Sequence, residues 1–150
     1  MKRIMKMDAA LVVLLCAAPA LTRAAAPPGR YTASAGTVTD TKTKLVWQEP
    51  FAPSTMTWAA AKSYCAGLGA TLGGSGWRLP TIKELQTLVD VSVSAGPAID
   101  PKYFPNTGRS AFWSSTPSTA DTSVAWMLAF SEEGELQAGM QTAIQVRCVR

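Results

Sequence analysis

Two kinds of apolar spacing in the first half of the chain predict a β-hairpin followed by a helix. Residues 37–40 and 45–48 are β-rich, and the polar turn between them is typical of a hairpin. A helix is expected to begin after Thr57, a good N-cap, and to run to Leu68. The residues that share its apolar face are Trp58, Ala61, Cys65 and Leu68. Cys65 is therefore expected to point into the core.

A second helix is predicted after Pro80, beyond a glycine-rich tight loop over residues 67–76. Thr81 and Glu84 have the spacing of a capping box, which marks the start of a helix. The buried stripe expected on this helix consists of Ile82, Leu85, Leu88 and Val89. The helix should end near Asp90.

The second half of the chain has the pattern of a long loop followed by a series of strands. Residues 91–107 contain prolines and no regular period, so this loop either carries function or packs itself down. Four later segments look like strands, at residues 112–115, 124–130, 135–140 and 143–149. The order of elements predicts an α+β fold, with two helices packed on a mainly antiparallel twisted sheet.

The first 24 residues have the three parts of a secretory leader, and cleavage is expected after Ala24. The positive head consists of Lys2, Arg3 and Lys6. The apolar stretch over residues 9–21 is shorter than the roughly 20 residues that span a bilayer, so a membrane anchor is disfavoured. A lipoprotein interpretation of Cys16 is also disfavoured, because bulky Leu15 precedes it. The protein is thus expected to be exported to the periplasm, the cell surface or the medium.

Removing the leader changes both the size and the charge of the chain. Residues 25–30 are small and Pro-rich and are expected to be a flexible lead-in to one domain over residues 31–150. The whole chain has 14 Lys and Arg against 10 Asp and Glu, and the leader holds four of the basic and one of the acidic residues. The remaining 10 basic and nine acidic residues nearly balance, which gives no reason to expect a nucleic acid as partner.

Cysteine and histidine content restricts the chemistry further. Cys65 and Cys148 remain after the leader, and an even count in an exported chain favours a disulfide. The chain has no histidine, which removes Ser-His-Asp and Cys-His nucleophiles and histidine-based metal sites. No enzyme activity, cofactor or metal is therefore expected. A carboxylate pair for glycoside cleavage remains open, its candidates being Asp90, Asp100, Asp121 and the acidic group over residues 132–135.

The tryptophans and two of the arginines are expected to be structural, whereas other cations are candidates for binding. All five tryptophans lie beside predicted elements, and a small domain buries such side chains in its core. Arg78 and Arg147 fall within apolar segments, where a guanidinium needs a carboxylate or several carbonyl partners. Glu84 and Asp90 are available to pair with one of them. The cations suited to sulfate or carboxylate groups are Lys42, Lys44, Lys102 and Arg109.

Several separated motifs, in order, resemble one bacterial family. They are Thr-Val-Thr-Asp-Thr-Lys-Thr-Lys-Leu-Val-Trp-Gln over residues 37–48, Trp58-Ala59-Ala60-Ala61 with Tyr64-Cys65, Gly76-Trp77-Arg78-Leu79-Pro80-Thr81 with Glu84-Leu85, Ile99-Asp100-Pro101 with Tyr103-Phe104-Pro105, Phe112-Trp113-Ser114-Ser115, and Val146-Arg147-Cys148-Val149-Arg150. On these motifs, residues 31–150 resemble the domain of unknown function 1566, or Lcl (collagen-like adhesin) C-terminal domain, family. The resemblance implies a C-type lectin-like fold, similar to that of the sulfatase-modifying enzymes, with a disulfide from the first helix to the last strand. It also implies framework roles for Trp77, Arg78, Pro80, Trp113 and Arg147.

Departures from these relatives narrow the implied function. The calcium-binding loop tripeptides of the lectins are absent, and Trp113 is followed by two serines instead of Asn-Asp. No cysteine is spare for formylglycine chemistry once the leader is removed. The resemblance therefore implies a non-catalytic binding module, adhesin-like, that recognises sulfated or acidic glycans without calcium. The alternative is a periplasmic or envelope structural or protein-interaction domain. The expected contacts within residues 91–111 are Lys102, Tyr103 and Arg109.

Overall fold

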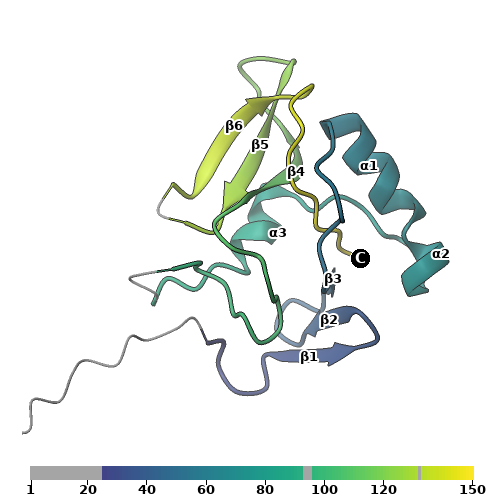
Figure 1. Ribbon diagram of the computed structural model, residues 1–150, viewed down its shortest axis with the longest axis vertical. Helices are drawn as coiled ribbons and strands as arrows, with labels where there is room; N and C mark the ends of the chain where they lie inside the picture. Colours follow the sequence, from purple (N-terminus) through teal and green to yellow (C-terminus); the bar gives the residue numbers. More distant parts are fainter. Residues whose placement is uncertain (1–24, 93–95, 132) are drawn as a thin grey trace, which may run out of the picture.

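The computed structural model describes residues 25–92, 96–131 and 133–150, and the predicted leader lies outside them (Figure 1). The first sheet is antiparallel, in the order β1 (Tyr31–Ser34), β2 (Thr37–Asp40) and β3 (Val46–Gln48). The second is antiparallel, in the order β4 (Ala111–Pro117), β5 (Val124–Ala129) and β6 (Glu135–Gly139). The helices are α1 (Trp58–Gly67), α2 (Gly69–Leu72) and α3 (Ile82–Gln86). The α+β class is confirmed, but the single sheet predicted from the sequence is wrong.

The two sheets are separate because the last segment of the chain is not a regular strand. The strand predicted over residues 143–149 is replaced by isolated bridges that reach several elements. Its backbone hydrogen bonds, with their N···O distances, join Val46 to Arg150 (2.8 Å), Gln48 to Cys148 (2.9 Å), Ala52 to Val146 (2.8 Å), Arg78 to Val149 (2.8 Å) and Trp113 to Gln145 (3.0 Å). Because this segment changes partner every one or two residues, it connects the two sheets without extending either as a ladder.

The predicted hairpin and helix starts are confirmed, with differences at the helix ends. Val38 pairs with Trp47 across β2 and β3, and Thr57 is the N-cap of α1. The capping box of α3 is present, since each of Thr81 and Glu84 accepts a hydrogen bond from the other's backbone N–H through its side chain. Helix α3 ends at Gln86, before the predicted end, because the following backbone bonds span three residues and tighten the chain into turns.

Two elements were missed by the sequence analysis. Strand β1 was placed in no element, although it forms the free edge of the first sheet. Helix α2 lies within the segment predicted as a tight loop, where Gly73 ends it with a positive φ of 69°. A helix of four residues is about one turn long, so a glycine-rich sequence of that length shows no repeating apolar spacing by which to recognise it.

The core is divided into two neighbouring clusters. One cluster gathers Trp47, Phe104, Phe112 and Phe130, and the other surrounds the disulfide with Trp77 and Trp113. Among the five tryptophans, Trp47, Trp77 and Trp113 are buried, whereas Trp58 and Trp126 are half-buried. Two of the buried indoles donate to backbone carbonyls, Trp113 to Met56 at 2.9 Å and Trp77 to Gly73 at 2.8 Å. Trp77 and Trp113 are therefore bonded within the core, and their framework roles stay a prediction.

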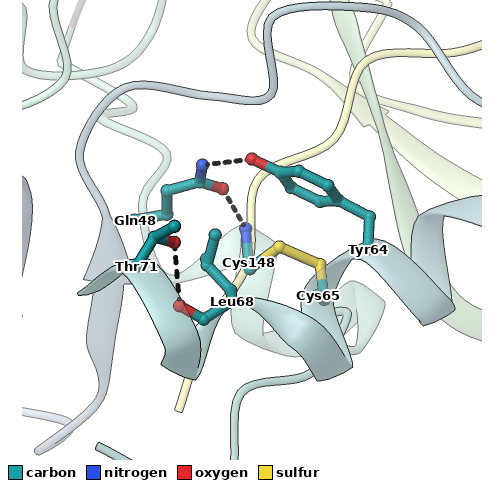
Figure 2. The surroundings of a disulfide bond; sticks show 6 residues. All are labelled: Gln48, Tyr64, Cys65, Leu68, Thr71 and Cys148. Carbon is teal, nitrogen blue, oxygen red and sulfur yellow. Dashed lines mark hydrogen bonds between the residues drawn. A yellow bond between two sulfur atoms is a disulfide. The ribbon is translucent and has the colours of Figure 1, made fainter. Parts of the chain in front are cut away.

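The predicted disulfide joins α1 to the last segment of the chain. Cys65 and Cys148 are both buried and bonded, with 5.4 Å between their Cα atoms. Figure 2 shows the Gln48 side chain beside this bond, where its Oε1 accepts from the Cys148 N–H at 3.2 Å and its Nε2 donates to Tyr64 at 2.9 Å. The bond therefore connects helix α1, strand β3 and the chain end. No helix in the described part of the chain is long and apolar enough to cross a membrane.

Candidate functional site

Two of the three predicted ligand residues, Lys102 and Tyr103, lie near residues 25–30, on a surface that we call the lead-in surface. It is defined by residues 25–31, the α3-to-loop segment 88–92, the loop 100–103 and the turn residues 41–42. Three open cavities of about 340, 300 and 520 Å³ lie along it. Residues 93–95, part of the predicted binding loop, lie outside the described residues.

The lead-in is held against the domain by hydrogen bonds to three other segments. The backbone N–H of Ala25 donates to Asp90 Oδ2 at 3.0 Å, and that of Ala26 donates to Asp100 Oδ2 at 2.8 Å. Arg30 forms an ion pair with the buried Asp40 at 3.1 Å and donates to the Thr87 carbonyl. The sequence predicted a flexible lead-in, and its flexibility stays a prediction. Its contacts make it one wall of all three cavities.

Asp40 fixes the hairpin turn that carries Lys42. Its Oδ1 accepts from the backbone N–H of Lys42 at 2.8 Å and of Thr43 at 3.3 Å. Burial raises the pKa of Asp40, but these bonds and the Arg30 guanidinium together hold it below its ordinary value. The carboxylate is therefore charged at neutral pH and keeps the turn in place. Lys42 is exposed and lines the cavity of about 300 Å³.

Lys102 and Tyr103 lie together at the edge of the largest of the three cavities. Asp100 forms their turn, since its Oδ1 accepts from the Lys102 N–H at 2.9 Å. The exposed Lys102 ammonium lies 5.1 Å from the centre of the half-buried Tyr103 ring. That ring lies 5.4 Å from the ring of Tyr31, and burial raises the pKa of Tyr31 to about 12. Lys102 thus presents a cation beside an aromatic ring that the core holds in place.

Arg109 does not join this pair. It is exposed in the turn before β4 and lines none of the three cavities. Within the described residues, no hydrogen bond, ion pair or cation–π contact connects it to Lys102 or Tyr103. Instead, the folded hairpin brings Lys42 to the lead-in surface. The sequence analysis named Lys42 as a candidate cation, but nothing in the spacing placed it near the lead-in.

The framework residue Arg78 is paired with Glu84, one of the two acids named for it. Two hydrogen bonds join the side chains, at 2.8 and 2.6 Å. These bonds raise the pKa of Arg78 and hold that of Glu84 below its ordinary value. The pair links the segment after the glycine-rich loop to the first turn of α3. Pro80, between them, is buried, and its carbonyl accepts from the Ser115 N–H at 2.7 Å.

Arg147 is the largest charged side chain in the core. Its Nη1 donates to the carbonyls of Gln48 at 2.9 Å and Glu49 at 2.6 Å, and its Nη2 donates to Thr107 Oγ1 at 2.8 Å. The rings around the guanidinium, all within 6 Å of its carbon, are Phe51, Phe104 and Phe112. Burial lowers the pKa of Arg147 to about 9, with the Glu49 carboxylate acting in the opposite direction. It remains charged at neutral pH and holds the loop after β3 in place.

Three of the carboxylates that the sequence left open for glycoside chemistry, those of Asp90, Asp100 and Asp121, have hydrogen-bond partners in the structure. Asp90 and Asp100 accept from the lead-in amides, and Asp121 accepts from the N–H and Oγ of Ser123 at 2.8 and 2.7 Å. Glu132 lies outside the described residues. Within the part of the chain that the structure describes, no group of three or more Asp, Glu, Cys or His residues is arranged to hold a metal ion.

Comparison with known proteins gives one result that covers most of the chain. No curated protein matches the sequence. The Lcl C-terminal domain family matches residues 36–150, a span that contains the β2–β3 hairpin, the disulfide, Arg78, Arg147 and the Lys102–Tyr103 loop. This match agrees with the resemblance drawn from the motifs, and it covers well over half of the chain. The chain therefore belongs to the Lcl C-terminal domain family.

Proposed function

We propose that this protein is a non-catalytic, exported binding module that recognises anionic glycans, sulfated or carboxylated, without calcium. Family membership supports an extracellular or envelope location. The predicted leader adds export, and the C-type lectin-like fold stays a prediction from the family resemblance. The lead-in surface is the proposed binding face.

The observation that carries the proposal is the position of Lys102 over Tyr103 beside the cavity of about 520 Å³. The exposed part of the half-buried Tyr103 ring offers apolar surface to the C–H side of a sugar ring, and a phenolic hydroxyl can donate to or accept from a ligand. An ammonium is a compact cation with three donors, which suits a sulfate or carboxylate oxygen. The two groups therefore combine the features that an anionic sugar needs.

The other charges on this surface also affect the affinity for an anionic glycan. Lys42 is exposed at the neighbouring cavity, so it extends the cationic edge. Asp90 and Asp100 are on the same surface, but each already accepts from a backbone N–H. An exposed ionic contact contributes about 0.2–1 kcal/mol, so a single domain should bind a sulfated sugar weakly and with marked salt dependence. Tight binding would require several domains on one polymer.

A structural or protein-interaction role in the envelope is the second candidate. It predicts an exposed apolar patch. Among the described residues, Val91, at 93% exposure, is the large hydrophobic side chain that is clearly exposed, and it lines the cavity of about 340 Å³. A single valine supports this role less than the lysine–tyrosine pair supports glycan binding.

The proposal is tested by titrating the exported, oxidised protein with dextran sulfate, with neutral dextran as the comparison polymer. Binding should survive a calcium chelator and weaken as salt rises. Lys102→Ala should weaken it about 1.5- to 5-fold. The matched control is Lys83→Ala, which removes the same charge from an exposed position on α3 that lines none of the three cavities. Equal effects of the two changes would contradict the proposed face, and equal binding of both dextrans would contradict recognition of the anion.

A further inference from the structure

We propose that Asp90, with Asp100 beside it, forms a binding site for the α-ammonium group that cleavage after Ala24 creates on Ala25. The site is built for the new end of the chain itself, so processing completes the lead-in surface. This inference rests on the export proposed above, but it does not depend on which ligand the surface binds.

Two consecutive backbone nitrogens already meet two carboxylates in the structure. Ala25 N lies 3.0 Å from Asp90 Oδ2, and Ala26 N lies 2.8 Å from Asp100 Oδ2. Ala26 is half-buried and packs against the core cluster that contains Leu88 and Ile99. In the uncleaved chain Ala25 N is a neutral amide with one hydrogen. After cleavage it is an ammonium with three hydrogens and a full positive charge.

Asp90 is held in position by hydrogen bonds that do not involve the lead-in. Its Oδ1 accepts from the Ser92 N–H at 3.0 Å and from Ser92 Oγ at 2.6 Å, which leaves Oδ2 for Ala25. Its own N–H donates to the Ala98 carbonyl at 2.9 Å, and the Ala98 N–H donates to Phe130 at 3.0 Å. Hydrogen bonds from Ser92 hold the pKa of Asp90 below its ordinary value, so the carboxylate is charged at neutral pH. A fixed carboxylate binds an ammonium more strongly than a mobile one, because less side-chain entropy is lost.

The remaining charged groups around Ala25 do not cancel this attraction. Arg30 lines the same cavity, but it is paired with Asp40 at 3.1 Å. Lys102 lines the cavity of about 520 Å³, which Ala25 also lines, and its ammonium lies over the Tyr103 ring. Tyr31 is neutral at neutral pH, because burial raises its pKa to about 12. Among the described residues that line the two cavities with Ala25, the carboxylates of Asp90 and Asp100 therefore stand against the Lys102 ammonium and the new ammonium, since Arg30 is paired with Asp40.

The position of the cut decides whether the site is filled. Cleavage after Ala24 keeps both nitrogen donors, those of Ala25 and Ala26. The new positive charge is then on the Ala25 nitrogen, which contacts Asp90. Cleavage after Ala26 would remove both donors and leave Pro27 as the first residue. The unprocessed chain keeps the donors but lacks the charge. Only the chain that begins at Ala25 makes the charge-assisted hydrogen bond.

The test uses the full chain, exported and processed by a bacterial host, and begins with the intact mass of the recovered protein. The pKa of the α-amine is then measured from its labelling rate at a series of pH values. We expect a mass that corresponds to a first residue of Ala25 and a pKa above the ordinary range of about 7.7–8.0. Asp90→Asn should return this pKa to the ordinary range. The matched control is Asp121→Asn, because Asp121 makes the same pair of bonds to Ser123 without contacting the lead-in.

Stability gives a second readout with a definite sign. The ammonium is favoured in the folded state, so its contribution is full below the unfolded pKa and is lost as pH rises through the raised folded pKa. Near pH 6, Asp90→Asn should raise the unfolding equilibrium constant about 1.5- to 5-fold more than Asp121→Asn does. The excess should vanish at strongly alkaline pH.

Each outcome decides the proposal. A first residue other than Ala25, or an ordinary α-amine pKa in the folded wild-type protein, overturns it, and the wild-type measurement decides even if Asp90→Asn does not fold. Failure of export and processing would overturn this inference and the exported role together. A processed protein that starts at Ala25 with an ordinary α-amine pKa would overturn this inference alone, whatever the dextran sulfate titration shows.

Discussion

Removing the disulfide should destabilise the domain by about 4.5 kcal/mol. Cys65 and Cys148 are 83 residues apart in sequence, and both are buried. In the chain-entropy model, a closed loop of about 83 residues lowers the entropy of the unfolded chain by about 15 cal/mol/K, or about 4.5 kcal/mol at 25 °C. A domain of this size has a total stability of about 6–19 kcal/mol, so the loss is a large fraction of it.

The bond can be separated from the packing of its two side chains by three variants. Cys65→Ala, Cys148→Ala and the double variant each break the same bond, so all three should lose about the same amount and the two single effects should not add. Guanidinium unfolding at neutral pH, followed by tryptophan fluorescence, measures this. The slope of the unfolding free energy with denaturant should also rise, because the uncrosslinked chain exposes more surface. Additive single effects, or a loss under about 1 kcal/mol in the double variant, would refute the reasoning.

Three further predictions concern the charged and phenolic groups that the fold buries or pairs. Arg147→Met should lower the free energy of unfolding by denaturant by about 3–5 kcal/mol, because it leaves carbonyl acceptors unpaired in the core. The control is Arg150→Met at an exposed position, which should lower it by under about 1 kcal/mol. The bonds from Arg78 lower the pKa of Glu84, so this pair stabilises the fold above about pH 4.3, and the effect is lost as pH falls through the folded pKa. Glu84→Gln should therefore cost about 1 kcal/mol of unfolding free energy at neutral pH and reduce the loss of stability between neutral and acid pH. An unchanged dependence of stability on acid pH would contradict the pairing. Alkaline absorbance titration should show one tyrosine that ionises near pH 12, the value to which burial raises the pKa of Tyr31, and Tyr31→Phe should abolish that step.

The local elements were predictable where a short sequence signal decides the structure. The capping box at Thr81 and Glu84 uses side chains three residues apart, so the start of α3 follows from the sequence alone. The turn between β2 and β3 is likewise local, and the even cysteine count favoured the Cys65–Cys148 bond. The choice of Glu84 over Asp90 as the partner of Arg78 needed the structure, because both acids lie within reach along the chain.

The long-range arrangement was not predictable in the same way. The β-rich composition of residues 143–149 indicates an extended chain, but its partners come from four separate parts of the sequence, so no ladder forms. The proposed binding surface also depends on contacts between distant parts of the sequence. The irregular loop over residues 91–107 makes Lys102 a candidate, whereas the small, Pro-rich composition of residues 25–30 predicts only a flexible lead-in. Nothing in the spacing shows that the Ala25 and Ala26 nitrogens reach carboxylates 65 and 74 residues away.

Locating the bound anion on the protein would test the proposed binding face most directly. Isotope-labelled exported protein would be titrated with a sulfated oligosaccharide in the presence of a calcium chelator, and the change in each backbone amide signal recorded. The account predicts that the largest changes lie at Lys102, Tyr103, Lys42 and the lead-in, and that they shrink as salt rises. Changes centred on exposed cations that line none of the three cavities, such as Arg78 and Arg150, or no change at saturating oligosaccharide, would contradict it.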